Sequence, residues 1–247
     1  MAGHSKWANI KHKKAKEDAK RGKAFTKLSK EITVVARMSG GDPAGNPRLR
    51  HLMEKGRAIN MPLENITRAI KKGTGELPGV NYEEMLYEGY GPHGIAVLLE
   101  ILTDNRNRTA GEMRRLFSSN GGSLGETGSV AWMFEKQGVI RASGETTEDA
   151  LLEHLIDFDI SDISQDESTF TIHCDARATE QVRKSVENMG LKIETAELEW
   201  VAKNSTELPD DQAEAVYEFL SELDDHDDVQ NVYADFDISD EVLATLA

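Results

Sequence analysis

A glycine-rich stretch at residues 73–79 divides the chain into two parts that differ in charge and in hydrophobic periodicity. The stretch, Gly-Thr-Gly-Glu-Leu-Pro-Gly, has the composition of a linker. Residues 1–72 hold 18 of the 29 Lys and Arg and 6 of the 44 Asp and Glu, a net charge of +12. Residues 73–247 have a net charge of −27, so the overall charge of −15 averages two opposite parts. At 247 residues the chain is long enough for two or three domains.

The basic part has the apolar spacing of α-helices. Apolar residues recur at intervals of three and four over residues 25–38, and a pair of glycines ends the pattern. The same spacing predicts a second helix over residues 49–59 and a third over residues 63–70. We therefore expect a small helical domain over residues 1–75.

Beyond the linker, alternating strands and helices predict an α+β fold. The first unit is expected to have strands at residues 82–89, 95–103 and 130–134 and a helix at residues 108–119. After Gly138 a second unit is expected, with strands at residues 139–141, 170–174 and 191–201 and helices at residues 148–158 and 179–189. Thr146 and Asp149 resemble a capping box at the start of the first of these two helices.

Because the strand at residues 170–174 is expected to be reached through a hairpin, the second unit has the order strand–helix–strand–strand–helix–strand, the split βαβ arrangement of ferredoxin-like domains. A last helix at residues 210–223 and a strand at residues 229–236 would complete the unit that is interrupted at Gly138. We expect an N-terminal three-helix domain followed by two ferredoxin-like α/β domains, one inserted in the other. The expected limits are residues 1–75 for the helical domain, 80–136 with 205–247 for the discontinuous domain, and 137–204 for the inserted domain.

The densest positive charge lies between His4 and Lys30, where ten Lys and Arg accompany two acidic residues. A cation placed against a phosphate releases counterions, so such a segment binds nucleic acid without reading its sequence. Trp7 and His12 add flat rings that can stack on unpaired bases. The alternative is a solvated charged face with Trp7 packed against the helical core. The candidate nucleic-acid-binding residues are Lys6, Trp7, Lys11, His12, Lys13, Lys14, Lys16, Lys20, Arg21, Lys23 and Lys27.

Two further features are candidates for phosphate contact. One is a second basic group at the expected start of a helix, where free N–H groups and the helix dipole also favour anions. Asp104 and Glu112 lie close to this group in sequence, so surface ion pairing is the alternative. The other is the glycine-rich run at residues 120–129, which lacks the Lys-Ser/Thr ending of a P-loop, so a structural turn is favoured. The second basic group consists of Arg106, Arg108, Arg114 and Arg115.

The sequence lacks the motifs of catalytic and metal sites. His173 and Cys174 are adjacent on an expected strand and point to opposite faces, so they do not bind one ion together. The acidic run at residues 224–228 lacks the glycine and the final glutamate of an EF-hand loop. We interpret this run as solvated charge, with weak Mg²⁺ binding as the alternative. We expect no catalytic residue, no metal and no cofactor.

Cysteine content and hydropathy indicate a cytoplasmic protein that does not enter a membrane. Cys174 is the only cysteine, which excludes an intramolecular disulfide and fits a reducing compartment. The longest aliphatic run, residues 95–99, is far shorter than the roughly 20 residues that span a bilayer. The first residues lack the apolar core of a signal peptide, and we expect them in the mature protein.

Residues 3–134 contain four long motifs: GHSKWANIKHKKAKEDAKRGKAFTKLSKEI, NPRLRHLMEKGRAINMPLENITRAIKKG, YEGYGPHGIAVLLEILTDNRNRTAGEMRRLF and GGSLGETGSVAWMF. In order and spacing these motifs resemble the YebC/PmpR family, which includes probable transcriptional regulators and is related to mitochondrial translational activators of cytochrome oxidase. The resemblance implies a helical domain, two α/β domains, a cytoplasmic location and no catalytic residues.

The resemblance leaves two functions open. One is a DNA-binding transcriptional regulator, and the other is a ribosome-associated factor that binds ribosomal RNA and assists translation of proline-rich stretches. Lysine contacts phosphate as a point charge and seldom reads bases, so the sequence supports binding better than sequence specificity. A nucleic-acid-processing enzyme, the third alternative, would need metal-binding carboxylates clustered beside the basic region, and the sequence has none there. The acidic domains would face protein partners or stay solvated, and the oligomeric state is left open.

Replacing Lys11, Lys13, Lys14 and Lys16 with Glu is expected to abolish binding to nucleic acid, because four attractive phosphate contacts become repulsive. The chain should remain folded. Fluorescence anisotropy with a DNA duplex and an RNA fragment, over a range of salt concentrations, measures the effect, and circular dichroism checks the fold. An unchanged affinity with an unchanged salt dependence would place the binding surface elsewhere.

Overall fold

The computed structural model describes residues 7, 21–166, 168–239, 241–242 and 245. The chain forms two compact units. We call Ala131–Glu207 with Asp235–Asp237 the ferredoxin-like unit, and Trp7–Val130 with Leu208–Ala234 and Ile238–Ala247 the larger unit. The division of the chain into three domains at the limits given above remains a prediction.

The larger unit contains the three expected helices, α2 (Arg21–Ser39), α3 (Pro47–Ala58) and α4 (Leu63–Thr74). Asn46 begins α3: its side-chain oxygen accepts a hydrogen bond from the Leu49 N–H at 3.1 Å, and its amide donates to carbonyls at the end of α2. Gly73 lets α4 approach α2 closely, because a Cβ there would lie 2.4 Å from the Thr33 carbonyl oxygen. The helices share a core of Leu28, Ile32, Val35, Leu49, Leu52, Met61, Ile66 and Ala69.

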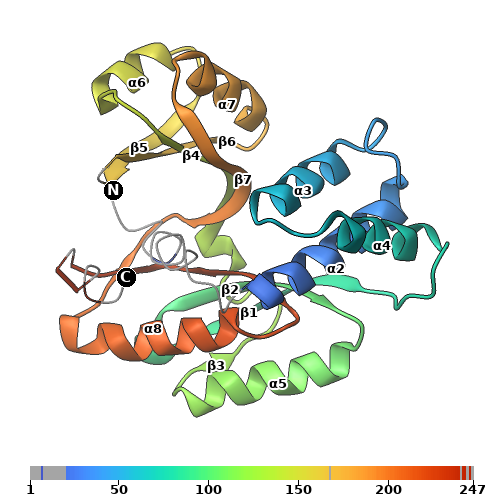
Figure 1. The fold of residues 1–247 in the computed structure, drawn as a ribbon. Coiled ribbons are helices and arrows are strands. Elements are labelled where there is room, and N and C mark those ends of the chain that lie inside the picture. The colour runs from blue at the N-terminus through green and yellow to red at the C-terminus, as the bar shows by residue number, and fades with distance from the viewer. Residues whose placement is uncertain (1–6, 8–20, 167, 240, 243–244, 246–247) are drawn as a thin grey trace. The chain divides into compact units, whose positions relative to one another are not determined.

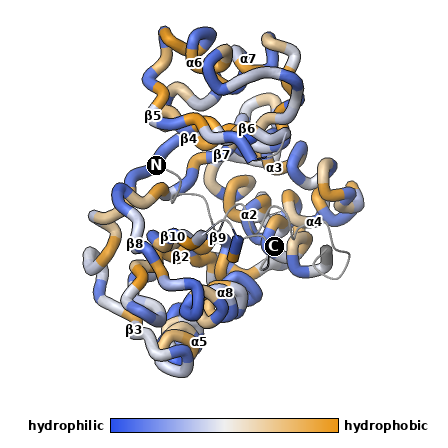
Figure 2. The backbone as a smooth tube through the Cα atoms, turned by 90° about the vertical axis from the view of Figure 1, so that its left-hand side faces the viewer, coloured by the Kyte–Doolittle hydropathy of each residue, from blue (hydrophilic) through white to orange (hydrophobic). Residues whose placement is uncertain are grey.

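A four-stranded antiparallel sheet forms the rest of the larger unit, in the order β3-β1-β2-β9. Its elements in chain order are β1 (Glu83–Tyr90), the 3₁₀ turn η3 (Pro92–Gly94), β2 (Ala96–Thr103), α5 (Arg106–Ser119), β3 (Ser123–Leu124), α8 (Asp210–Asp224) and β9 (Val229–Ala234). Phe117 of α5 and Phe219 of α8 pack edge to face with ring centroids 5.0 Å apart, so the two helices share one core with the sheet (Figure 1). Figure 2 shows β2 as a hydrophobic segment, in agreement with its burial at the centre of this sheet.

The ferredoxin-like unit has the strand order β5-β6-β4-β7, with every neighbouring pair antiparallel. Its elements are β4 (Phe134–Ser143), α6 (Glu148–His154), β5 (Ile160–Asp166), β6 (Thr169–Asp175), α7 (Thr179–Asn188) and β7 (Lys192–Ala202). This order confirms the split βαβ prediction and, with the three N-terminal helices, the α+β class. A short parallel pair, β8 (Thr206–Glu207) with β10 (Phe236–Asp237), completes the unit.

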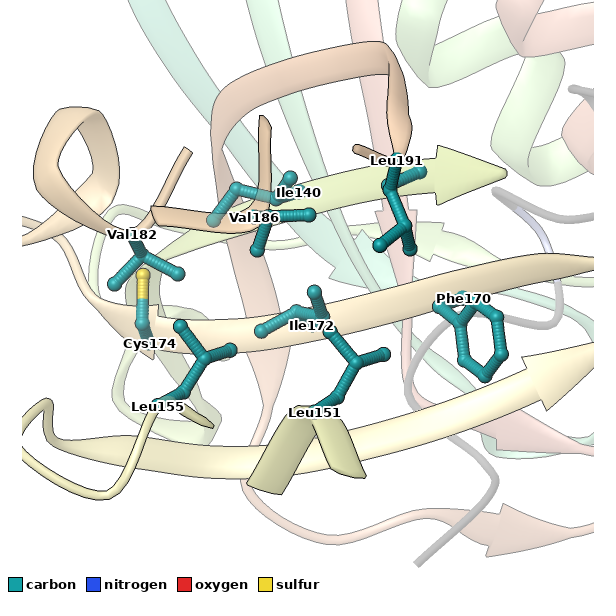
Figure 3. Packing of buried hydrophobic residues seen from close by; sticks show 10 residues of the cluster. Ile140, Leu151, Leu155, Phe170, Ile172, Cys174, Val182, Val186 and Leu191 are labelled. Carbon is teal, nitrogen blue, oxygen red and sulfur yellow. The ribbon is translucent and has the colours of Figure 1, made fainter. Parts of the chain in front are cut away.

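Alternating strand residues and one side of each helix build the core of the ferredoxin-like unit. Ile140 of β4 and Phe170, Ile172 and Cys174 of β6 face Leu151 of α6 and Val182 of α7 (Figure 3). These side chains are all at most 1% exposed, so the strands and both helices enclose a continuous apolar interior.

Two local predictions were wrong. The strand expected at residues 130–134 is instead a 3₁₀ turn, η4 (Ala131–Met133), followed directly by β4, whose pairing partners all lie in the ferredoxin-like unit. The third strand of the larger sheet is β3, inside the glycine-rich run. The cap of α6 is Thr147, which accepts from the Ala150 N–H, rather than the predicted Thr146. Over the part of the chain that the structure describes, no helix is long and apolar enough to cross a membrane.

Replacing Leu151 with Ala is expected to lower the free energy of unfolding by about 2–5 kcal/mol, because it leaves a cavity in the core of the ferredoxin-like unit. Chemical denaturation measures the loss. Leu152 is the matched control: it is the next residue of the same helix but is 55% exposed, and Leu152→Ala should cost less than about 1 kcal/mol. Equal losses in the two variants would contradict the assignment of the buried face.

Candidate nucleic-acid interface

Three lysines on α2 contact one acidic loop of the same unit. Lys23, Lys27 and Lys30 are spaced by four and three residues, so they form a stripe along one side of the helix, which we call the lysine stripe. Opposite them lies the acidic loop, Asp224–Asp228, which leads from the end of α8 into β9. In Figure 1 the red end of α8 lies beside the blue start of α2.

Each ammonium of the lysine stripe reaches both a backbone carbonyl and a carboxylate of the acidic loop. Lys23 Nζ donates to the Asp225 carbonyl oxygen at 3.2 Å and lies 3.4 Å from its carboxylate. Lys27 Nζ donates to the Asp224 carbonyl oxygen at 2.5 Å and lies 3.7 Å from its carboxylate. The carbonyls belong to the C-terminal end of α8, where the helix dipole favours a cation and the last turn of α8 supplies none itself.

Lys30 binds the acidic loop at its most buried point. Its Nζ donates to Asp228 Oδ1 at 2.7 Å and to the Asp227 carbonyl oxygen at 2.9 Å, and lies 5.6 Å from the centre of the Tyr82 ring. The side chain of Lys30 is 11% exposed, compared with 48% for Lys23. The contact between α2 and the acidic loop is therefore buried at Lys30 and exposed to solvent at Lys23.

The Asp228 carboxylate joins four segments of the larger unit. Besides Lys30, Oδ2 accepts from Arg108 Nη2 at 2.7 Å, from Thr109 Oγ1 at 2.8 Å and from Thr103 Oγ1 at 3.1 Å. Burial alone would raise the pKa of this carboxyl, but the hydrogen bonds from Lys30, Arg108 and Thr109 outweigh it and hold the pKa well below the usual value. Asp228 is therefore a buried, ionised and fully partnered carboxylate, and the interpretation of residues 224–228 as solvated charge was wrong for it.

The structure describes few of the side chains predicted to bind nucleic acid. Lys23 and Lys27 lie in the lysine stripe, and Arg21 is the first residue of α2. Trp7 is buried at 8% exposure, with its ring 6.1 Å from that of Tyr217 of α8 in an edge-to-face arrangement, so the ring packs on α8, and its stacking on bases remains a prediction. Outside the described residues lie Lys6, Lys11, His12, Lys13, Lys14, Lys16 and Lys20.

The four arginines of the second basic group differ in their ion pairs. Arg108 pairs with Asp228 and, at 3.0 Å, with Asp104, and it therefore has a structural role at the start of α5. Arg106 lies 3.7 Å from a carboxylate oxygen of Glu83. The remaining two, Arg114 and Arg115, are exposed and form no ion pair within the described part of the chain.

Sequence reasoning missed a set of exposed cations on α3 and α4. They project from the solvent side of both helices, opposite the shared core, and within the described ranges they have no carboxylate partner. The signal was present in the sequence, because these cations occupy the positions between the apolar residues that predict each helix. We call Arg50, Arg57, Lys71 and Lys72 the exposed cations.

The glycine-rich run is organised by a buried carboxylate of the protein itself. Glu88 of β1 accepts hydrogen bonds from the Gly128 N–H at 2.7 Å and the Val130 N–H at 2.8 Å, and its carbonyl accepts from Gly125. Gly128 has a φ of 90°, a conformation that glycine adopts without strain. These N–H groups donate to a carboxylate of the protein itself, so the run is a structural turn rather than a phosphate-binding loop.

Glu112, His226 and Asp228 bring ligand atoms within 4.8 Å of one another, but these atoms already have partners in the protein. The Asp228 N–H donates to His226 Nδ1 at 3.1 Å, which leaves the proton on Nε2 to donate to Glu112 Oε2 at 3.0 Å. Both Asp228 oxygens accept from cations. The cluster is a hydrogen-bonded support for the acidic loop.

Comparison with known proteins relates both parts of the chain to one family. A family model described as the TACO1/YebC protein N-terminal domain matches residues 5–76, and one described as the TACO1/YebC second and third domain matches residues 82–236. Two curated proteins named probable transcriptional regulatory protein are similar throughout: one from Geobacter sulfurreducens is 50% identical over 100% of both chains, and one from Halothermothrix orenii is 51% identical over 98% of both. The crystal structure of a conserved hypothetical protein from Aquifex aeolicus is 44% identical, covers 96% of this chain and 98% of its own, and has a TM-score of 0.85.

Replacing Asp228 with Asn is expected to lower the free energy of unfolding at pH 7 by about 3 kcal/mol, because Lys30 loses its buried counter-charge. The folded-state pKa of Asp228 is below the value of about 3.9 for an unfolded chain, so the contribution is complete above that pH and is lost as pH falls below it. Denaturant unfolding from pH 7 to pH 2 should therefore show a flatter acid dependence in the variant. Asp225→Asn removes the same charge at an exposed site and should cost less than about 1 kcal/mol.

Proposed function

The chain belongs to the TACO1/YebC family, and from this premise we propose that it is a nucleic-acid-binding regulator of gene expression that acts by binding rather than by catalysis. Its relatives are named probable transcriptional regulatory proteins, which supports the regulatory role. The proposed binding region is the basic helical part over residues 1–75, and the proposed location is the cytoplasm.

The observation that carries this proposal is the separation of charge along the chain. Residues 1–72 have a net charge of +12 in a protein whose remaining residues have a net charge of −27. Such a gradient attracts a polyanion to one part of the molecule and repels it from the rest, so binding is oriented as well as favourable. The exposed cations on α3 and α4 support the same conclusion, because they extend the positive surface beyond the lysine-rich segment.

Transcriptional regulation through duplex DNA is the first candidate, because it agrees with the names of the relatives. Association with the ribosome, through ribosomal RNA and with an effect on proline-rich stretches, is the second. The composition of the basic segment favours this second candidate: nine of the ten cations between His4 and Lys30 are lysines, which contact phosphates without reading bases. The acidic parts of the chain would then face protein partners or solvent.

Sedimentation of a cell lysate at physiological salt, with and without nuclease, separates the two candidates. Ribosome association predicts co-migration with ribosomes that persists after nuclease treatment mild enough to leave the ribosomes intact. Transcriptional regulation predicts a protein that stays at the top of the gradient and protects a defined promoter sequence from cleavage at the same salt. A protein that binds neither ribosomes nor DNA or RNA in purified form would overturn the proposed function.

Replacing Arg50, Arg57, Lys71 and Lys72 with Gln is expected to weaken binding to a random-sequence DNA duplex. The dependence of log affinity on log salt should also flatten, by up to about 0.9 for each phosphate that the variant no longer neutralises. Anisotropy titrations at several salt concentrations measure both quantities. Arg183→Gln with Lys184→Gln on α7 is the control in the ferredoxin-like unit, where both cations already pair with Glu180. A control as impaired as the test variant would place the binding surface elsewhere.

A further inference from the structure

We propose that the acidic loop is an internal competitor of nucleic acid, which occupies Lys23 and Lys27 of the lysine stripe and must release them before a phosphate backbone can bind there. The inference rests on the proposed function, since it describes how the same binding region is regulated. It follows from the hydrogen bonds and ion pairs between α2 and the end of α8, which are all within the larger unit.

The acidic loop offers the lysine stripe the chemistry of a phosphodiester backbone. Each of Lys23 and Lys27 has one carbonyl oxygen and one carboxylate oxygen of the same aspartate within 3.7 Å. A phosphate group likewise presents more than one oxygen and a negative charge to an ammonium. From Lys23 to Lys27 the stripe extends about 6 Å along the helix axis, which is within two nucleotide steps of about 3.4 Å axial rise in a duplex. A nucleic-acid strand can therefore replace the loop at Lys23 and Lys27.

Burial increases along the stripe from Lys23 to Lys30, so the ion pairs differ in how readily they exchange. The Lys23–Asp225 pair is about half exposed, and the Lys27–Asp224 side chains retain 16% and 19% exposure. Lys30 and Asp228, in contrast, are 11% and 5% exposed, and Asp228 is also bound by Arg108, Thr103 and Thr109. Exposed ion pairs add little to stability, whereas a buried partnered charge is costly to separate. The loop therefore opens from the Lys23 end while Lys30 and Asp228 remain joined.

The competition sets a threshold for binding. A weak or short polyanion has to displace two aspartates that are held beside the stripe at high local concentration. A target that also engages the rest of the basic region binds additional cations and displaces the aspartates readily. The acidic loop thus lowers affinity for incidental polyanions more than for a target that covers the whole basic surface.

The test compares two pairs of carboxylates on α8 and its end. Asp224→Asn with Asp225→Asn neutralises the competitor, and Glu214→Gln with Glu218→Gln is the control, which removes the same charge from exposed positions of the same helix that form no ion pair within the described residues. The probes are a random-sequence DNA duplex and an RNA hairpin of matched length, and anisotropy gives affinity and salt dependence for each.

The aspartate variant should bind roughly three- to tenfold more tightly than wild type. The affinity of the control variant should rise by less than half of that factor. For the aspartate variant on DNA, the slope of log affinity against log salt should steepen by about 1.8, because two lysines become free to contact phosphates. Equal gains in the two variants would overturn the proposal, since they would reflect net charge alone. If wild-type protein binds neither probe at any salt, the proposed function itself fails.

Lysine acetylation followed by mass spectrometry gives an independent readout that does not depend on affinity. Lys23 and Lys27 should be slow to react in free wild-type protein, fast in the aspartate variant, and slow again when the variant is saturated with the DNA duplex. Lys30 should stay protected in all three states. Adding Lys23→Gln with Lys27→Gln to the aspartate variant should remove its gain in affinity; a gain that persists would show that the stripe does not contact nucleic acid and would overturn the proposal.

Discussion

The larger unit depends on one buried carboxylate. Asp228 is 5% exposed in its side chain, and it is ionised because Lys30 of α2, Arg108 and Thr109 of α5, and Thr103 of β2 all donate to it. A buried charge is tolerated only when its hydrogen-bonding capacity is filled, so α2, α5, β2 and the acidic loop have to meet in one arrangement. The Asp228 carbonyl also accepts from the Leu102 N–H at 2.8 Å, which fixes the loop to the edge of β2. This buried site, together with the contacts of Lys23 and Lys27 to the acidic loop, holds α2 beside the end of α8.

Much of the fold could be predicted from local patterns, because those patterns follow the geometry of the elements. The apolar spacing in α2, α3 and α4 and the alternation in β6 led to the three helices and the ferredoxin-like order. The alternation of Val130, Trp132 and Phe134 was misleading, since three residues are too few to separate a strand from a 3₁₀ turn followed by a strand. The strand β3 lies among glycines and consists of Ser123 and Leu124 alone, and two residues are too few for local propensity to indicate a strand.

The candidate site was predictable in its charge and unpredictable in its ion pairs. Counting charges along the chain locates the basic region and the acidic loop, but Lys30 of the lysine stripe and Asp228 are separated by 198 residues. No spacing rule relates residues so far apart, so the acidic run was interpreted as solvated. Arg108 could not be assigned from spacing for the same reason. Its position at the start of a helix suggested an anion-binding site, and the anion that it binds is Asp228, 120 residues later in the chain.

The late position of Asp228 has a consequence for synthesis. The ribosome releases the chain from its N-terminus, so α2, β1, β2 and α5 emerge well before α8 and β9, with the whole segment Ala131–Glu207 between them. Until then β2 has an unpaired edge, and Lys30 and Arg108 have no Asp228 to bind. The nascent protein therefore passes through a stage in which Lys30 and Arg108 lack their counter-charge and the sheet is open, and completion of the last two elements supplies both the carboxylate and the missing strand.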